Sequence, residues 1–394
     1  MLKDRAILFL AIGQTLVWAG LYYVFPALLV RWEQSLGWSR VDLTAAITLS
    51  IFVSAFVAPF AGRLIDTGRG ALMMVGSTLL GAICLLALSF VTELRDFYLV
   101  WSLIGVMMAG CLYEPCFALI THARGVNAKQ AIILVTLVAG FASTISFPSA
   151  HALSEAFGWR VAVQVFAAVL ILVAAPMMWL GARAVEQTGN LARLRPKEHA
   201  SHRHAFLLRP VFWFLSLSFA FLAVVHGVTI HHFLPVLYDR GIHADVAIMA
   251  ASFIGPMQVA GRLAMMAAER HVTTNEITIA CFVVVGISIL LLLNTATAPT
   301  LLVGFVILFG AGHGVVSIIR PLIARDILGE NNFGAKFGAM ALLYLVGSAS
   351  APYLGSLVWG IGGYDLVLPV LIALVMVGLG LYLIAQRLSH VQKL

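Results

Sequence analysis

The chain has 394 residues, of which 61% are hydrophobic and only 10% are charged. Soluble domains are usually about half apolar and about a quarter charged, so this composition excludes an ordinary soluble enzyme or binding domain. The formal net charge of +7 would suit a nucleic-acid partner. The basic residues fall mainly in loops between apolar runs, however, which is the pattern of a membrane protein, and no nucleic-acid partner is expected.

Long, nearly uncharged runs carry the apolar excess, and each is long enough for the roughly 20 residues that cross a bilayer. They predict an all-α polytopic membrane protein, because a β-barrel would show alternating segments of about ten residues. The first run follows a charged N-terminus without a small-residue cleavage site, so a retained helix is expected. The predicted spans are 6–30, 43–65, 71–92, 97–121, 129–152, 159–181, 210–236, 245–267, 275–295, 299–323, 335–359 and 364–386.

The distribution of basic residues predicts the orientation of the chain. Of the 24 lysines and arginines, Arg320 lies within a span, and five lie in the loops of one side. The remaining 18 lie on the other side, which is therefore cytoplasmic by the positive-inside rule and holds both termini. We expect a multi-pass protein of the inner membrane whose basic face also attracts anionic membrane lipids.

Span one carries a polar and aromatic row. Gln14, Trp18 and Tyr22 are spaced i, i+4 and i+8, so they share one helical face. Such a row suits the wall of a substrate cavity, and we include all three as candidate substrate-binding residues. Packing inside the helix bundle is the alternative.

Glu114 precedes Pro115 inside the fourth span. An ionised carboxylate in hydrocarbon costs roughly 2.5 kcal/mol or more unless it faces a partner or water, so such a residue marks a functional pathway by default. We expect Glu114 either to carry a coupled proton or to form a gating ion pair with Arg320. The sequence leaves both roles open.

The longest polar segment, 182–209, is rich in Arg, Lys and His and is predicted to be a basic cytoplasmic linker. It divides the chain into an N-terminal six-helix bundle, 1–181, and a C-terminal six-helix bundle, 210–394.

Span ten contains the strongest candidate site. His313, Ser317 and Arg320 are spaced i, i+4 and i+7 and line one helical face. Histidine changes charge near neutral pH, and arginine offers a planar fork for a carboxylate or phosphate. This face is therefore predicted to bind an anionic substrate, with His313 and Arg320 as candidates for proton coupling or gating. Alternatively, Arg320 extends to the cytoplasmic surface.

Two further residues complete the candidate site in the second half. His226 in span seven is the deepest of three histidines there, and it is a candidate for substrate binding and proton coupling. Tyr344 begins an i, i+4, i+8 row in span eleven. For both residues, packing between helices is the alternative. A metal site is not expected, because the three histidines of span seven do not share a helical face.

The two halves repeat each other. Ala61-Gly62-Arg63-Leu64 closes span two, and Ala260-Gly261-Arg262-Leu263 closes span eight, with Arg262 at the cytoplasmic end. Glu114-Pro115 and Arg320-Pro321 also occupy matching places. Repeats in the same order predict a six-plus-six duplication.

The loop after span two carries the motif Gly62-Arg63-Leu64-Ile65-Asp66-Thr67-Gly68-Arg69. With this motif, the twelve spans and the long central loop, the chain resembles the major facilitator superfamily. The motif has one residue fewer than usual between its aspartate and second glycine, and Gly70 replaces a final basic residue. The resemblance implies two pseudo-symmetric bundles and a cytoplasmic latch formed by Gly62, Asp66, Gly68 and Arg69, whose geometry these departures leave open.

The segment Gly37-Trp38-Ser39-Arg40 before span two is similar to bacterial monocarboxylate-porter-like members of that superfamily. The phosphate loop, the nucleophile turn and the paired-histidine zinc motif are all absent from the sequence. We therefore expect no enzyme activity, no cofactor and no resident metal.

Together these features predict a functional monomer that moves a small organic solute by alternating access. Arg320 favours an organic anion as substrate, and Glu114 and the membrane histidines favour H+ as the coupling ion. Efflux of amphipathic drugs by proton antiport is the alternative.

Overall fold

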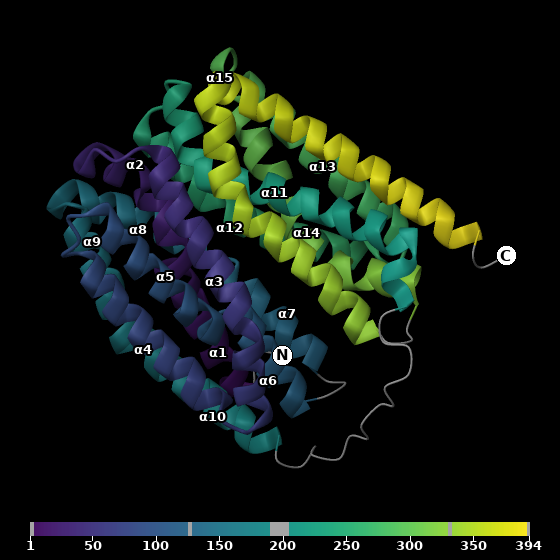
Figure 1. Ribbon diagram of the computed structural model, residues 1–394, viewed down its shortest axis with the longest axis horizontal. Helices are drawn as coiled ribbons and strands as arrows, with labels where there is room; N and C mark the ends of the chain where they lie inside the picture. The colour runs from purple at the N-terminus through teal and green to yellow at the C-terminus, as the bar shows by residue number, and fades with distance from the viewer. Residues whose placement is uncertain (1–3, 125–127, 190–204, 330–332, 392–394) are drawn as a thin grey trace. The chain divides into compact units, whose positions relative to one another are not determined.

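The computed structural model describes residues 4–124, 128–189, 205–329 and 333–391, and every regular element in these ranges is helical (Figure 1). Within the described residues, eleven helical stretches are long and apolar enough to cross a membrane. The last stretch, Lys336–Ser389, has 54 residues. At 1.5 Å per residue it would be about 80 Å long, far more than one crossing of a hydrocarbon core of about 30 Å. It therefore accounts for two crossings, which gives the expected twelve.

The break within that last stretch lies at two adjacent glycines. Gly362 and Gly363 leave helical geometry, and Gly363 has φ of 64°. This left-handed conformation is strained for residues with a Cβ atom, so glycine is the residue that suits a tight turn between two antiparallel helices.

The chain divides into two compact units, Met1–Lys197 and Glu198–Leu394, and each is described by itself. The helices of the first unit are α1 (Arg5–Val17), η1 (Trp18–Tyr23), α2 (Val24–Leu36), α3 (Arg40–Asp66), α4 (Gly70–Leu88), α5 (Leu94–Cys111), α6 (Tyr113–Arg124), α7 (Ala128–Ala139), α8 (Ala142–Phe157), α9 (Trp159–Val169), η3 (Leu170–Ala174) and α10 (Ala175–Gly189).

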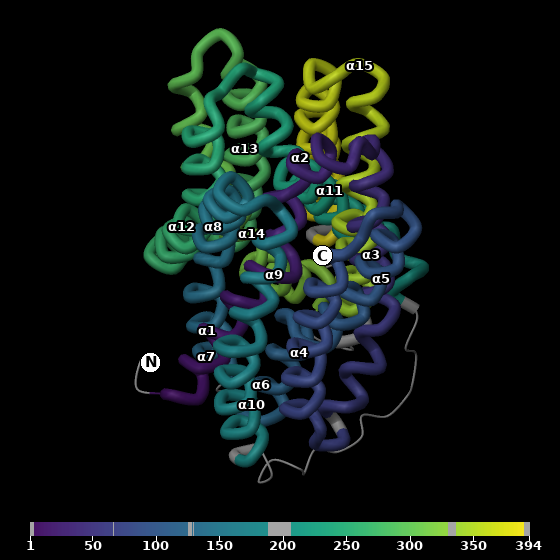
Figure 2. Tube along the Cα trace, turned by 90° about the vertical axis from the view of Figure 1, so that its left-hand side faces the viewer, coloured from purple at the N-terminus to yellow at the C-terminus, as the bar shows by residue number. Residues whose placement is uncertain are grey.

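Close helix contacts in the first unit depend on small residues. A Cβ atom added to Gly105 in α5 would overlap the backbone of Ser50 in α3, and one added to Gly181 in α10 would overlap α1 at Ala6 and Leu10. In lipid, where apolar burial gives little driving force between helices, such backbone approach supplies the packing energy. Both views show α6 beside α10 at one end of this unit (Figures 1 and 2).

Two segments of the first unit are π-helical. They are η1 in the first span and η3 in the sixth, and the leucine side chain at the start of η3 lies against Gly20 of η1. A π-turn carries one extra residue and shifts the side chains that follow it, which is why such turns are frequent at functional sites.

The second unit is formed by η4 (Ala205–Leu208), α11 (Pro210–Asp239), α12 (Ala244–Ala268), α13 (Thr274–Leu293), η5 (Asn294–Ala296), α14 (Leu301–Leu328) and α15 (Phe333–Val391). Glycines again set the closest approach. A Cβ atom on Gly261 of α12 would overlap the Ala311 backbone of α14, and one on Gly314 would overlap Gln258. The α12 and α14 backbones therefore nearly touch, which positions the residues beside these glycines.

Large apolar side chains also remain on the surface, among them Phe56, Phe90 and Leu172. In water such exposure would mark a binding face, but on helices that cross a membrane it provides the surface that contacts lipid.

Candidate transport site

The candidate residues of the second unit gather around α14. Ser317 is exposed on this helix, and His313 and Arg320 are half-buried on the same face. The Ser317 hydroxyl donates to the carbonyl oxygen of Gly314 at 3.0 Å. The predicted i, i+4, i+7 row thus lies within one regular helix, as the spacing requires.

His226 of α11 stacks on His313. The ring centroids are 3.2 Å apart and the ring planes differ by 1°, and Phe309 stacks on His226 from one turn earlier in α14, at 5.7 Å. Two residues that lie 87 positions apart in the sequence are therefore in direct ring contact.

The guanidinium group of Arg320 lies over aromatic rings of α15. Its central carbon is 3.9 Å from the centroid of the Tyr344 ring and 5.6 Å from that of Phe337. The negative face of an aromatic ring attracts such a cation and holds its plane in a defined orientation. Arg320 and Tyr344, predicted separately, thus lie in direct contact.

Arg262 of α12 is the functional candidate that the sequence analysis missed. Its side chain is 5% exposed, and Nε donates to the carbonyl oxygen of Gly314 at 3.0 Å. The glycines of α12 and α14 could have revealed this position, because their close approach places Arg262 against the turn between His313 and Ser317.

The matching residue of the first half has a different environment. Arg63 is exposed, with its guanidinium carbon 5.2 Å from the Phe60 ring centroid. The repeated tetrapeptide therefore holds one exposed arginine and one buried arginine, which the sequence did not distinguish.

In the first unit, Gln14 is completely buried and bonds to backbone rather than lining a surface. Its amide Nε2 lies 2.7 Å from the carbonyl oxygen of Cys111 and 3.4 Å from that of Leu112. These carbonyls lie at the break between α5 and α6. Gln14 therefore joins the first span to this break, and its predicted role in substrate binding stays a prediction.

Trp18 and Tyr22 belong to a cluster of aromatic rings on η1 and α6. The Trp18 ring centroid lies 5.0 Å from that of Tyr22 and 4.7 Å from that of Tyr113, and Tyr113 stacks on Phe117 at 4.9 Å. Glu114, the second residue of α6, is exposed beside this cluster. The structure therefore groups three predicted residues of the first half with two that the sequence had not singled out.

At the other end of α6, Arg124 forms an ion pair with Asp4, with 2.5 Å between Nη1 and Oδ2. Asp4 also caps the start of α1 by accepting from the backbone N–H of Ile7. The hydrogen bond from Arg124 is the main cause that holds the pKa of Asp4 below its usual value.

The predicted latch residues lie in the last turns of α3, which holds Gly62 and Asp66, and in the turn before α4, which holds Gly68 and Arg69. Gly68 has φ of 75°, and the backbone N–H of Arg69 donates to the carbonyl oxygen of Leu64 at 2.9 Å. The side chain of Arg69 is exposed, whereas the side chain of Asp66 lies outside what the structure describes. A Cβ atom on Gly62 would meet no described atom within 4 Å, so no close approach explains that glycine.

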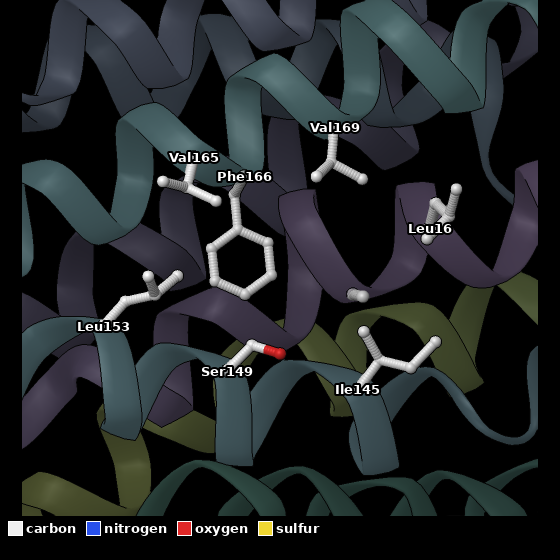
Figure 3. Close-up of a pocket in the computed structure, with 8 residues that line it drawn as sticks. Leu16, Ile145, Ser149, Leu153, Val165, Phe166 and Val169 are labelled. Carbon is white, nitrogen blue, oxygen red and sulfur yellow. The ribbon is translucent and has the colours of Figure 1, made fainter.

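An apolar cavity of about 120 Å³ lies elsewhere in the first unit, between α8, α9 and the first span (Figure 3). Phe166, Leu153 and Ile145 are among its lining residues, and the hydroxyl of Ser149 is its polar group. None of the predicted site residues lines this cavity.

Comparison with known families decides what class of protein carries these residues. Residues 10–352 match the sequence profile of the Major Facilitator Superfamily. The chain belongs to the major facilitator superfamily.

Two solved structures show the same fold as this facilitator-superfamily protein. A bacterial homologue of the human lysosomal transporter Spinster, in an inward-facing and occupied conformation, has a TM-score of 0.69 and 14% identity, with 98% of this chain and 97% of that chain covered. The nucleoside transporter NupG has a TM-score of 0.73 and 13% identity, with coverages of 96% and 98%. At these identities the likeness concerns the fold alone.

Monocarboxylate transporter 12 of Xenopus laevis is 25% identical over 301 residues, which are 70% of this chain. The matched segment spans 65% of the length of that relative. Family membership makes this chain a multi-pass membrane protein of a transporter superfamily.

Proposed function

We propose that this protein carries a small organic anion across the inner membrane by proton-coupled alternating access. The observation that carries the proposal is the arrangement around α14, where His313 and Arg320 share one helical face and His226 of α11 stacks on His313. Arg262 adds a second positive charge, and it bonds to the carbonyl oxygen of Gly314, the residue after His313.

The two arginines favour an anion as ligand. The planar guanidinium of Arg320 matches a carboxylate through paired hydrogen bonds, so a substrate carboxylate suits this fork.

The histidine pair and Glu114 are the proposed proton carriers. A neutral imidazole pair that accepts one proton when the anion binds would keep the site near charge balance, which links the two movements. Glu114, exposed in the other unit, serves either as a second proton carrier or as part of a gate. The proposal includes a functional monomer with both termini in the cytoplasm and anionic lipids around its basic face, as the loop charges predict.

A ligand screen tests the substrate class. Purified protein is heated with panels of carboxylates, phosphorylated metabolites and amphipathic cations while its unfolding midpoint is recorded. A ligand present at 100 times its Kd stabilises by about 2.7 kcal/mol, which gives a measurable shift. The proposal expects stabilisation by carboxylates that disappears in Arg320→Ala and partly persists in Arg320→Lys. Stabilisation by amphipathic cations alone would overturn it.

Export of amphipathic drugs by proton antiport remains the second candidate, because of the aromatic cluster of the first unit. Trp18, Tyr22, Tyr113 and Phe117 lie beside the exposed carboxylate of Glu114. Rings together with an acidic group attract organic cations. Export would show as increased sensitivity of a deletion strain to such compounds and its reversal by the wild-type gene but not by Glu114→Gln.

A further inference from the structure

The fourth span is interrupted next to Glu114. α5 ends at Cys111, α6 begins at Tyr113, and Leu112 between them is extended, with φ of −80° and ψ of −158°. Pro115 has no N–H, so it cannot donate to the carbonyl of Cys111 four residues earlier. An unbonded carbonyl inside a membrane costs several kcal/mol, and this one therefore needs another donor.

Gln14 is that donor. Its side-chain amide reaches the Cys111 carbonyl oxygen at 2.7 Å and the Leu112 carbonyl oxygen at 3.4 Å, and the side chain is fully buried. A proline-induced break in one helix is thus closed by an amide that comes from another helix, 97 residues earlier in the chain.

The first span also holds the rest of α6. One turn after Gln14, the Trp18 ring contacts Tyr113, the first residue of α6, and at the opposite end Asp4 pairs with Arg124, the last residue of α6. The twelve-residue helix α6 therefore contacts the N-terminal segment and first span near both of its ends. The extended residue Leu112 connects α6 to α5, and we call it the joint.

We propose that Gln14 is a positioning residue for α6. By bonding the two carbonyls at the break, it holds the joint at Leu112 in its present geometry and so sets the direction in which Glu114 is presented, without itself touching the substrate. This role differs from the substrate contact expected from the sequence, and it rests on the proposed function of Glu114.

Cysteine labelling tests the geometry. Cys116 is fully buried one turn into α6, so a loosened joint should expose its thiol to a small maleimide. Because a buried carbonyl that loses its hydrogen bond destabilises the closed geometry, Gln14→Leu should raise the labelling rate of Cys116 about tenfold. Peptide mapping reads each cysteine separately, and buried Cys281 of the other unit should stay unchanged. Thr15→Val is the matched control, since this buried neighbour bonds only within its own helix, to Ala11.

Pro115→Ala provides the decisive background. Once Leu112 takes helical geometry, the alanine N–H can bond the Cys111 carbonyl, so the amide of Gln14 is no longer required there. Gln14→Leu should then raise Cys116 labelling in the wild-type background and have little effect in Pro115→Ala. Equal effects in both backgrounds, or no effect in either, would overturn the proposal. If Gln14→Leu alone fails to accumulate, recovery of the folded protein in Pro115→Ala supports the same role and its failure contradicts it.

A functional readout separates positioning from a general loss of stability. In proteoliposomes, Gln14→Leu should change the pH profile of substrate uptake in the same direction as Glu114→Gln, whereas Thr15→Val should keep the wild-type profile. A lower rate with an unchanged profile contradicts positioning. If Glu114→Gln leaves the profile unchanged, the proposed role of Glu114 fails, while the labelling result still decides whether Gln14 holds the joint.

Discussion

The imidazole rings of His226 and His313 lie face to face, with 3.2 Å between their centroids and 1° between their planes. They come from α11 and α14, and Arg262 bonds to the carbonyl oxygen of Gly314, the residue after His313. Under the proposed function this pair is the coupling site, and an anion bound beside it would favour its protonation.

The first prediction concerns this pair. His313→Gln removes the titrating group but keeps a polar side chain, so proton-driven uptake should fall about tenfold or more while substrate counterflow, which needs no net proton movement, is largely retained. His226→Phe keeps an aromatic ring stacked on His313 but removes the titrating group. It should therefore also lower proton-driven uptake while largely retaining counterflow. Parallel loss of uptake and counterflow would assign His313 to substrate binding instead.

Arg262 and Arg63 form a natural matched pair. Arg262→Ala removes a buried side chain and leaves the carbonyl of Gly314 without this donor, so it should lower the free energy of unfolding by about 1–3 kcal/mol. Arg63→Ala, at the exposed equivalent, should change it by no more than about 0.5 kcal/mol. Thermal unfolding in detergent measures both, and equal effects would contradict the difference in environment.

Gly261 and Gly62 occupy the same place in the repeat and give a second matched comparison. The Cβ atom of Gly261→Ala would overlap the backbone of α14, and such overpacking typically costs about 1–3 kcal/mol. Gly62→Ala meets open space among the described atoms, and replacing a helical glycine by alanine there should stabilise by up to about 1 kcal/mol. The two unfolding midpoints should therefore move in opposite directions.

The Asp4–Arg124 ion pair predicts a pH dependence outside the membrane spans. Because Arg124 lowers the pKa of Asp4 in the folded state, the pair stabilises the protein above the unfolded-state pKa, and this contribution is lost as pH falls through the folded value. The Asp4 side chain is 34% exposed, so the effect should be at most about 1 kcal/mol. Wild type should unfold at a higher temperature than Asp4→Asn at pH 7, and the difference should shrink below about pH 4. A constant difference would contradict the account.

Much of the fold follows from composition and spacing. Twelve runs of about 20 apolar residues predict twelve membrane-spanning helices. In lipid each backbone N–H and C=O needs a hydrogen bond, and a helix supplies these bonds within a single segment. The row His313, Ser317 and Arg320 was likewise predictable, since helical spacing alone places these residues on one face.

Tertiary contacts account for what the sequence did not indicate. The stacking of His226 on His313 and the contact of Arg320 with Tyr344 depend on which helices are neighbours. The burial of Arg262 depends on the approach of two glycine-bearing backbones. The helical spacing of Gln14, Trp18 and Tyr22 predicted a row that lines a cavity. The amide of Gln14 instead bonds to the Cys111 carbonyl at a helix break, because Pro115 has no N–H to bond that carbonyl.

Proteoliposome flux is the most direct test of the central claim. Carboxylates that stabilise the purified protein are supplied outside liposomes with an inward proton gradient, and uptake is compared for wild type, Arg320→Lys and Arg320→Ala. The account predicts concentrative uptake by wild type that collapses when a protonophore removes the gradient, and no uptake by Arg320→Ala. Gradient-independent uptake, or unchanged uptake by Arg320→Ala, would contradict it.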